Sequence, residues 1–242
     1  MIFDIHTHIL PAVDDGAEDI NESLELLAMM KAQGITDCIA TPHFYPESDN
    51  LSDFINRIST AFKQLQEAIS NKDLPNIYLG SEVLYFEGIG YSRSISKLCL
   101  NGCPVLLLEL TDESITEKLF EDLLIIKNNM GITPIIAHVE RYHNAKKYRS
   151  FLKFLKANKI PTQINAASLF IPEYKRAIKK LITSGLAYVI ATDTHSVNER
   201  PPRLDDALAL IEKNYGKSHR IRLVRNSQIL YEKIVSEDTF YA

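Results

Sequence analysis

Histidine and carboxylate side chains recur along this chain at the points where short apolar runs end. His6 and His8 close the first run, and Asp193 and His195 follow the last. Residues i and i+2 of a strand point to the same side, so each pair can bind one ion together. Five of the seven histidines stand at such ends, which favours one shared site. Single residues follow the runs between: His43, Glu82, Glu109 and His138.

Imidazole and carboxylate groups without a thiolate suit Zn²⁺, Mn²⁺ or Fe²⁺. The candidates are too many for one tetrahedral ion, so we expect two or three ions close together, with a shared carboxylate such as Glu82 as a bridge. Clusters of this kind generate hydroxide from a bound water and hold phosphoryl oxygens during in-line attack. The expected reaction is therefore hydrolysis of a phosphomonoester by metal-bound hydroxide.

Seven apolar runs alternate with helical patterns, as in sheets covered on both faces. The runs are residues 2–5, 36–41, 77–81, 105–110, 133–137, 162–165 and 187–191. The first helical pattern begins near Asp19, with Glu22 in capping-box position, and stops at Gly34. The others cover residues 51–71, 116–129, 148–158, 174–184 and 204–214.

This alternation predicts an α/β fold with parallel strands and outer helices. About seven units favour a closed or nearly closed barrel, with a doubly wound open sheet as the alternative. Either fold gathers the carboxyl ends of its strands, where the histidines and carboxylates stand. No stretch resembles a linker, since the longest uncommitted one covers only residues 44–50, so residues 1–242 are expected to form a single domain.

Composition bounds the function further. A formal charge of −4 argues against nucleic-acid binding, and the basic groups at 141–156 and 175–180 are spaced like solvated helix faces. No signal peptide or membrane-spanning stretch is found, and Cys38, Cys99 and Cys103 fit free thiols. A reduced, cytoplasmic location is therefore expected.

Several short motifs recur at the ends of the apolar runs and beyond them. The motifs are DIHTHILPAVDDG at 4–16, ATPH at 40–43, GSE at 80–82, AHVERY at 137–142, INA at 164–166, ATDTH at 191–195 and RPP at 200–202. They resemble those of the polymerase and histidinol phosphatase (PHP) superfamily. Within it, the sequence is similar to bacterial capsule-type manganese-dependent protein-tyrosine phosphatases. The resemblance covers residues 1 to about 205 and implies a distorted (β/α)7 barrel, the PHP fold.

The resemblance implies three ion positions, with Mn²⁺ favoured and Fe²⁺ or Zn²⁺ possible. His43 and His138 would join Glu82 at a second position, and Asp15 with His195 would serve a third. Asp15 is preferred over Asp14 by family position alone. The first position would be held by His6, His8, Glu82 and Asp193. The phosphate-binding, catalytic arginines would be Arg141 and Arg200.

Other residues near these motifs are left open. Glu109 either binds an ion or orients a ligand, and Asn165 either hydrogen-bonds within the site or satisfies the end of its strand. Three aromatic residues either line the substrate groove or pack as ordinary loop residues: Tyr45, Tyr85 and Phe86. His143 and His219 are expected at the surface.

The resemblance implies that the substrate is phosphotyrosine on a bacterial tyrosine kinase of capsule or exopolysaccharide synthesis. A cysteine-dependent route is excluded, because the residues six places after the cysteines are Phe44, Val105 and Glu109 instead of arginine. Histidinol-phosphate phosphatase, or another small-molecule phosphoesterase, is the main alternative. A nuclease, an amidohydrolase or a non-catalytic barrel fits less well. The oligomeric state and the role of residues 232–242 are not predicted.

Overall fold

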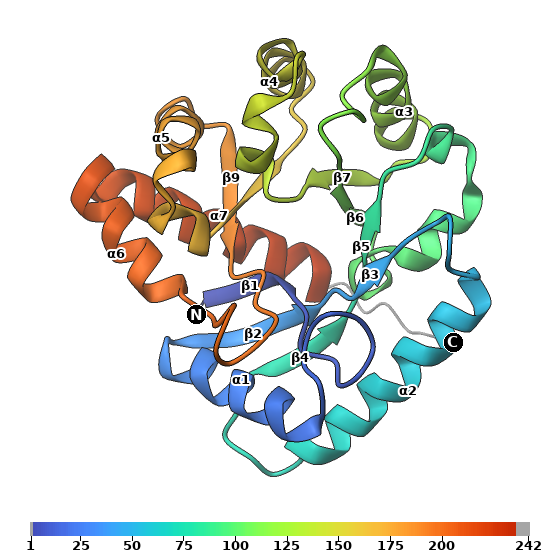
Figure 1. The fold of residues 1–242 in the computed structure, drawn as a ribbon, viewed down its shortest axis with the longest axis vertical. Coiled ribbons are helices and arrows are strands. Elements are labelled where there is room, and N and C mark those ends of the chain that lie inside the picture. Colours follow the sequence, from blue (N-terminus) through green and yellow to red (C-terminus); the bar gives the residue numbers. More distant parts are fainter. Residues whose placement is uncertain (1, 236–242) are drawn as a thin grey trace.

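The computed structural model describes residues 2–235, whose nine strands form two all-parallel sheets (Figure 1). One sheet has the order β1-β2-β4, and the other has the order β3-β5-β6-β7-β8-β9. The bounds are β1 Ile2–Thr7, β2 Ile35–Ala40, β3 His43–Phe44, β4 Asn76–Leu79, β5 Glu82–Leu84, β6 Val105–Glu109, β7 Thr133–Ile136, β8 Thr162–Asn165 and β9 Ala187–Ala191. All seven predicted strands are present.

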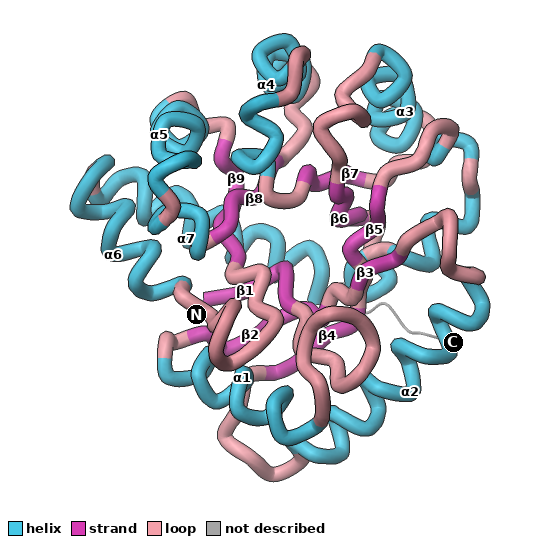
Figure 2. The backbone as a smooth tube through the Cα atoms, in the orientation of Figure 1, coloured by secondary structure: helices cyan, strands magenta, loops and turns pink. Residues whose placement is uncertain are grey.

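Backbone hydrogen bonds join the two sheets into a ring. The short strands β3 and β5 continue β2 and β4 after two-residue breaks. At the other junction, Asp193 N donates to His6 O and His8 N donates to Thr194 O, both at 2.9 Å. The strands thus surround a common centre (Figure 2).

Helices cover the outside of the ring (Figure 1). The side chain of Asp19 caps the first helix by accepting from the backbone of Asn21 and Glu22. The α-helices are α1 Ile20–Ala32, α2 Leu51–Ile69, α3 Glu117–Asn128, α4 Tyr148–Ala157, α5 Lys175–Thr183, α6 Leu204–Tyr215 and α7 Lys217–Val235. The short 3-10 helices are η1 Ile89–Tyr91, η2 Arg93–Leu98, η3 Leu100–Gly102, η4 Val139–Asn144, η5 Ala167–Phe170 and η6 Pro172–Tyr174.

The core has two parts. A large cluster fills the space between the strands and the outer helices. A smaller cluster joins inward side chains of the strands to Leu230 and Ile234 of α7. Its strand members include Phe3, Ile5, Leu107, Ile135 and Val189.

Helix α7 was not predicted from the sequence. It packs against β1 and β9, and its Asn226 donates to the carbonyl of Tyr188 in β9 at 2.7 Å. Of the segment whose role was left open, residues 232–235 end this helix, and residues 236–242 lie outside the described part. No helix within residues 2–235 combines the length and hydropathy that a membrane span needs.

Candidate metal centre

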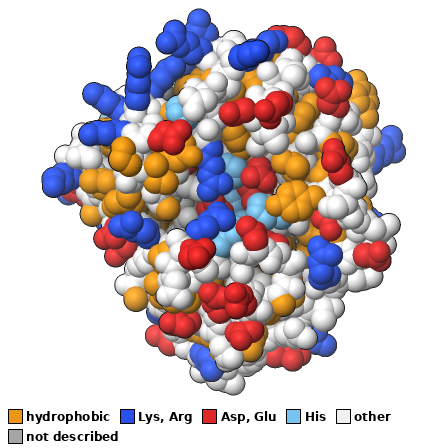
Figure 3. All heavy atoms as spheres, in the orientation of Figure 1, with side chains coloured by type: hydrophobic (Ala, Val, Ile, Leu, Met, Phe, Trp, Pro, Cys, Tyr) orange, Lys and Arg blue, Asp and Glu red, His pale blue; other side chains and the backbone are white. Residues whose placement is uncertain are grey.

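The predicted ligands meet at the carboxyl ends of the strands. Pale blue histidines lie in a hollow at the middle of the face in Figure 3, among acidic and basic side chains. His43 and Glu82 begin the short strands β3 and β5, which continue β2 and β4, and every other predicted ligand lies at the end of a strand or in the loop that follows it. Most are buried, while the side chain of Asp15 is 63% exposed at the rim and that of Glu109 is 19% exposed.

The four side chains predicted for the first ion lie together and form a first candidate ligand group. The Nε2 atoms of His6 and His8 lie 3.1 and 3.3 Å from Glu82 Oε2. Both also approach Asp193 Oδ1, at 3.3 and 3.5 Å. One ligand atom from each residue lies within 4.8 Å of the others, so a single cation fits this group.

Glu82 also belongs to a second group. Its Oε1 lies 2.9 Å from His138 Nε2, and that nitrogen is 3.4 Å from Glu109 Oε1. His43 Nδ1 lies 3.1 Å from Glu82 Oε2 and 3.7 Å from Glu109 Oε2. Glu109, whose role the sequence left open, therefore faces the same space as the ligands.

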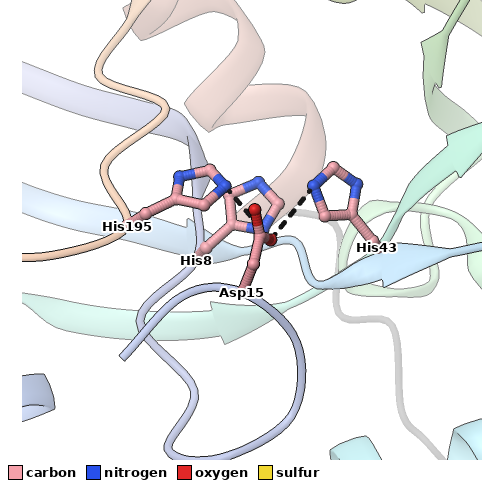
Figure 4. Close-up of side chains that lie close together, drawn as sticks. All are labelled: His8, Asp15, His43 and His195. Atoms are coloured by element: carbon pink, nitrogen blue, oxygen red, sulfur yellow. Dashed lines mark ion pairs between the residues drawn. The ribbon is translucent and has the colours of Figure 1, made fainter. Parts of the chain in front are cut away.

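Asp15 defines a third group. Its Oδ1 is 3.5 Å from both His43 Nε2 and His195 Nε2 (Figure 4). His8 lies within the same group. His43 thus presents one nitrogen to Glu82 and the other to Asp15. A neutral imidazole has a single free lone pair, so His43 serves only one ion at a time.

Neighbours occupy the second ring nitrogen of four histidines and turn Nε2 toward the centre. Such outer contacts fix the orientation of a metal ligand. They are His6 Nδ1 with Gln163 Oε1 at 3.3 Å, His8 Nδ1 with Asp14 Oδ2 at 2.7 Å, His138 Nδ1 with Tyr142 Oη at 3.0 Å and His195 Nδ1 with Asp193 O at 3.0 Å.

Of these neighbours, Gln163, Asp14 and Tyr142 were not predicted to act on the site. Gln163 precedes Asn165 by two on β8, whose residues are all buried, so a polar i, i+2 pair on one face of that strand was an available signal. Asp14 also accepts from Gly16 N at 3.0 Å and from His43 N at 3.0 Å, and therefore ties the loop to the site as well.

Charge at the centre suits cations. Burial would raise the pKa of Glu82, but His6 and its histidine neighbours hold that pKa well below its usual range. Burial likewise opposes ionisation of Asp193, yet the nearby histidines keep its pKa low. Burial lowers the pKa of His195 to about 2, which leaves its imidazole neutral and able to bind a metal.

Some polar atoms at the centre lack a partner. Among the described residues, nothing makes a hydrogen bond of good geometry to Glu82 Oε2, His43 Nδ1 or His195 Nε2. Buried polar atoms are normally satisfied, and cations supply the missing partner for such lone pairs. The residues present therefore fit a cluster of divalent ions.

Two site residues hold strained backbone conformations. His138 has φ 29° and Asp193 has φ 51°, values that L-residues rarely adopt. Both stand two residues after the end of a strand and turn their side chains toward Glu82 or His6. Strain of this kind is found where surrounding contacts fix a functional geometry.

The predicted arginines converge on one ligand. Arg141 Nη2 lies 2.7 Å and Arg200 Nη2 lies 2.9 Å from Asp193 Oδ2. Their side chains remain about one-third exposed, at 35% and 38%. Both line a cavity of about 720 Å³ beside the centre, called here the arginine cavity, whose wall also includes Phe170, Tyr174 and Arg203. Guanidinium groups in this position can bind phosphoryl oxygens.

The remaining candidates divide by position. Asn165 donates to Asp193 Oδ2 and so acts within the site. Tyr45 stacks on the His43 ring with centroids 5.1 Å apart and is 40% exposed, so it borders the open side of the centre. Tyr85 is buried and donates to Asp122, and Phe86 packs on the large core cluster, so both have structural roles.

Two histidines and the three cysteines lie away from the metal centre. His143 and His219, expected at the surface, are both half-buried. Cys38, Cys99 and Cys103 are free, as expected, and the structure buries all three.

A set of buried histidines and carboxylates around a shared glutamate, with two arginines at the rim, is the arrangement of a multinuclear metal-dependent hydrolase. The profile of the family described as "Capsular polysaccharide synthesis, CpsB/CapC" matches residues 2–231. The chain therefore belongs to the CpsB/CapC family.

Relatives of known name agree with this membership. "Tyrosine-protein phosphatase YwqE" of Bacillus subtilis is 31% identical over 95% of this chain and 91% of its own. "Tyrosine-protein phosphatase CpsB" of Streptococcus pneumoniae is 28% identical over 89% of this chain and 91% of its own.

Solved structures resemble this one to different degrees. A crystal structure from work on YwqE and CpsB, described as "unique metal-dependent tyrosine phosphatases", matches with a TM-score of 0.85 at 28% identity. It covers 96% of this chain and 95% of that one. Histidinol phosphate phosphatase from Lactococcus lactis matches with a TM-score of 0.51 at 14% identity over 81% and 86% of the chains, which indicates a shared fold alone.

Proposed function

We propose that this protein is a metal-dependent tyrosine-protein phosphatase. The observation that carries the proposal is the convergence of three ligand groups on Glu82 and its neighbours, with Arg141 and Arg200 at the rim of the same hollow. The names of the relatives supply the substrate class, which the geometry alone leaves open.

We assign the ions by the lone pairs that each side chain offers. His6, His8, Glu82 and Asp193 would hold the first ion. If His43 bound the second ion, the third ion would keep only Asp15 and His195, because His8 already binds the first ion. Without His43, the second ion would still have Glu82, Glu109 and His138. His43 is therefore placed at the third ion, not with His138 as the resemblance implied. Mn²⁺ is the proposed metal, since imidazole and carboxylate ligands suit it.

When bound, the ions supply Lewis-acid chemistry, activating water and neutralising phosphoryl charge. The chain's own residues do the rest. Arg141 and Arg200 bind the phosphoryl oxygens, each already anchored through Asp193. Asn165 keeps Asp193 in place. No cysteine takes part, because all three thiols are buried among core residues.

The proposed substrate is phosphotyrosine on a bacterial tyrosine kinase of capsule or exopolysaccharide synthesis, in the cytoplasm. The family description, which names capsular polysaccharide synthesis, supports this assignment. The catalytic unit is proposed to be a single domain. Its support is that α7, near the described carboxyl end, packs on β1, the first strand.

A substrate panel tests the proposal. Protein treated with a chelator and reloaded with Mn²⁺, Fe²⁺ or Zn²⁺ would be assayed with three substrates at equal concentration: a phosphotyrosine peptide, a phosphoserine peptide and histidinol phosphate. We expect kcat/KM to be highest for the phosphotyrosine peptide with at least one of the metals. A preference for histidinol phosphate would instead support the small-molecule alternative.

A further inference from the structure

A basic groove lies next to the arginine cavity and has no part in the chemistry described above. It runs between the η4–α4 segment and α5, with a volume of about 640 Å³. Figure 3 shows the corresponding gathering of blue side chains at the upper left, where Figure 1 places α4 and α5. The side chains that matter here are His143, Lys146, Tyr148, Arg149, Arg176 and Lys180.

Charge in this groove is one-sided. Four of its lining residues carry lysine or arginine side chains, and none of the lining residues is acidic. All four are exposed, and none of them forms an ion pair within the described part of the chain. One acidic side chain does meet the groove at His143, whose Nε2 lies 3.8 Å from Glu173 Oε1. A solvated helix face normally mixes charges of both signs, so a concave wall with one sign points to an anionic ligand.

Buried polar atoms at the groove point the same way. Tyr148 is 7% exposed, and its hydroxyl has no hydrogen-bond partner within the described part of the chain. The same is true of His143 Nδ1. Polar atoms left unpaired beneath a groove can be satisfied by a bound ligand.

The groove is continuous with the catalytic side of the molecule. His143 stands two residues after Arg141 in η4. Its ring meets the ring of Tyr174 edge-on, with centroids 5.5 Å apart, and Tyr174 lines the arginine cavity. The His143–Tyr174 pair, called here the His143–Tyr174 partition, therefore joins a residue that lines the groove to one that lines the arginine cavity. The opposite side of the site, by contrast, is lined by acidic residues, including Asp15, Glu18, Asp19 and Glu22.

We propose that the basic groove binds an acidic segment of the phosphoprotein substrate, on one side of the phosphotyrosine. This inference rests on the proposed function and adds a sequence preference to it. With the phosphate held by Arg141 and Arg200, the flanking chain crosses the His143–Tyr174 partition and places its carboxylates against Arg149 and Arg176. If the peptide bound the other way round, its carboxylates would be repelled by the acidic residues on the other side of the site. A concave site between two helices suits a peptide better than a flat membrane surface does.

Charge reversal tests the groove. The double variant Arg149→Glu/Arg176→Glu would be assayed on two phosphotyrosine peptides, one with acidic flanks and one with neutral flanks, and on p-nitrophenyl phosphate. We expect KM for the acidic peptide to rise about tenfold at low salt, because two exposed attractions become repulsions. Turnover of p-nitrophenyl phosphate, set by the metal centre, should stay as in the wild type. Lys72→Glu/Lys97→Glu is the matched control, with equal charge change at exposed sites elsewhere.

A measurement on the wild type needs no variant. Rising salt should increase KM for the acidic peptide much more than for the neutral one, because salt screens exposed charges. Equal KM values for the two peptides at all salt concentrations, with phosphotyrosine hydrolysis intact, would contradict peptide binding in the groove. The phosphatase assignment would then still stand. Hydrolysis of neither peptide would overturn the phosphatase assignment itself. Binding to anionic lipid vesicles that the groove variant loses, without a peptide preference, would assign the groove to a membrane instead.

Discussion

Glu82 is the residue on which the metal centre depends most. Its two oxygens face different ligand groups, His6 and His8 on one side and His138 on the other. In Glu82→Gln the amide loses the charge that two ions would share. We expect phosphatase activity to fall by at least about 100-fold, with fewer ions bound per chain. Metal analysis and kcat/KM measure this. The exposed Glu113→Gln variant is the control, and wild-type metal content in Glu82→Gln would contradict the bridging role.

A substitution at Arg141 tests the phosphate-binding role proposed for the arginines. Arg141→Lys keeps the positive charge but loses the fork that contacts Asp193 and a phosphoryl oxygen together. We expect kcat/KM to fall about tenfold to 100-fold while bound metal is unchanged. Lys146→Arg, a reverse exchange on the same side of the molecule, should have little effect on p-nitrophenyl phosphate turnover. A loss of metal in Arg141→Lys would show that the arginine acts on the ions instead of on the phosphate.

The sequence pointed to the candidate ligands better than to their neighbours. Histidines and carboxylates after apolar runs stand out because few other roles put them there, and the structure brings all of them together. Gln163 and Tyr142 could not be predicted in the same way. Amide and phenol groups occur throughout proteins, and only the fold shows that they contact His6 and His138. The ion proposed for His43 was equally out of reach, since its two ring nitrogens face different groups in the fold.

At the scale of elements, the loop after β1 is held by very close packing. A Cβ added at Gly16 would stand 2.1 Å from the carbonyl oxygen of His8 and 2.6 Å from its Cβ. Because backbone must move to admit it, we expect Gly16→Ala to displace Asp14 and Asp15. The cost should be about 1–3 kcal/mol in the free energy of unfolding. The third ion, which is assigned to Asp15, should bind more weakly.

Gly88→Ala is the matched control for this loop. Gly88 has φ 83°, but nothing lies within 4 Å of an added Cβ. Its substitution should cost about 1 kcal/mol of backbone strain without a change in metal binding. Isothermal titration with Mn²⁺ separates the two variants, and equal affinities would refute the role given to the loop.

Helix α7 contributes to stability from the other end of the ring. Leu230 is 4% exposed and packs among the inward side chains of the strands. We expect Leu230→Ala to lower the free energy of unfolding by about 2–5 kcal/mol through the cavity it leaves. The neighbouring Ile229 is 43% exposed, so Ile229→Ala should cost less than about 1 kcal/mol. Urea unfolding followed by circular dichroism compares them, and equal losses would contradict this packing.

For the whole molecule, alternation of apolar runs and helical patterns was enough to predict the α/β architecture. Periodicity could not choose between a ring and an open sheet, because that choice depends on the pairing of the first strand with the last. Asp193 N and His8 N make those bonds, to His6 and Thr194, which are far from them in the sequence. Helix α7 escaped prediction because its apolar positions are few and stand among charged residues.

Metal removal and return tests the central claim most directly. Chelator-treated protein would be freed of metal, confirmed by elemental analysis, and titrated with Mn²⁺ while phosphotyrosine peptide hydrolysis and bound metal are both measured. We expect negligible activity without metal, and recovery that follows the binding of two or more ions per chain in the wild type but not in Glu82→Gln. Full activity in the metal-free protein would contradict the account.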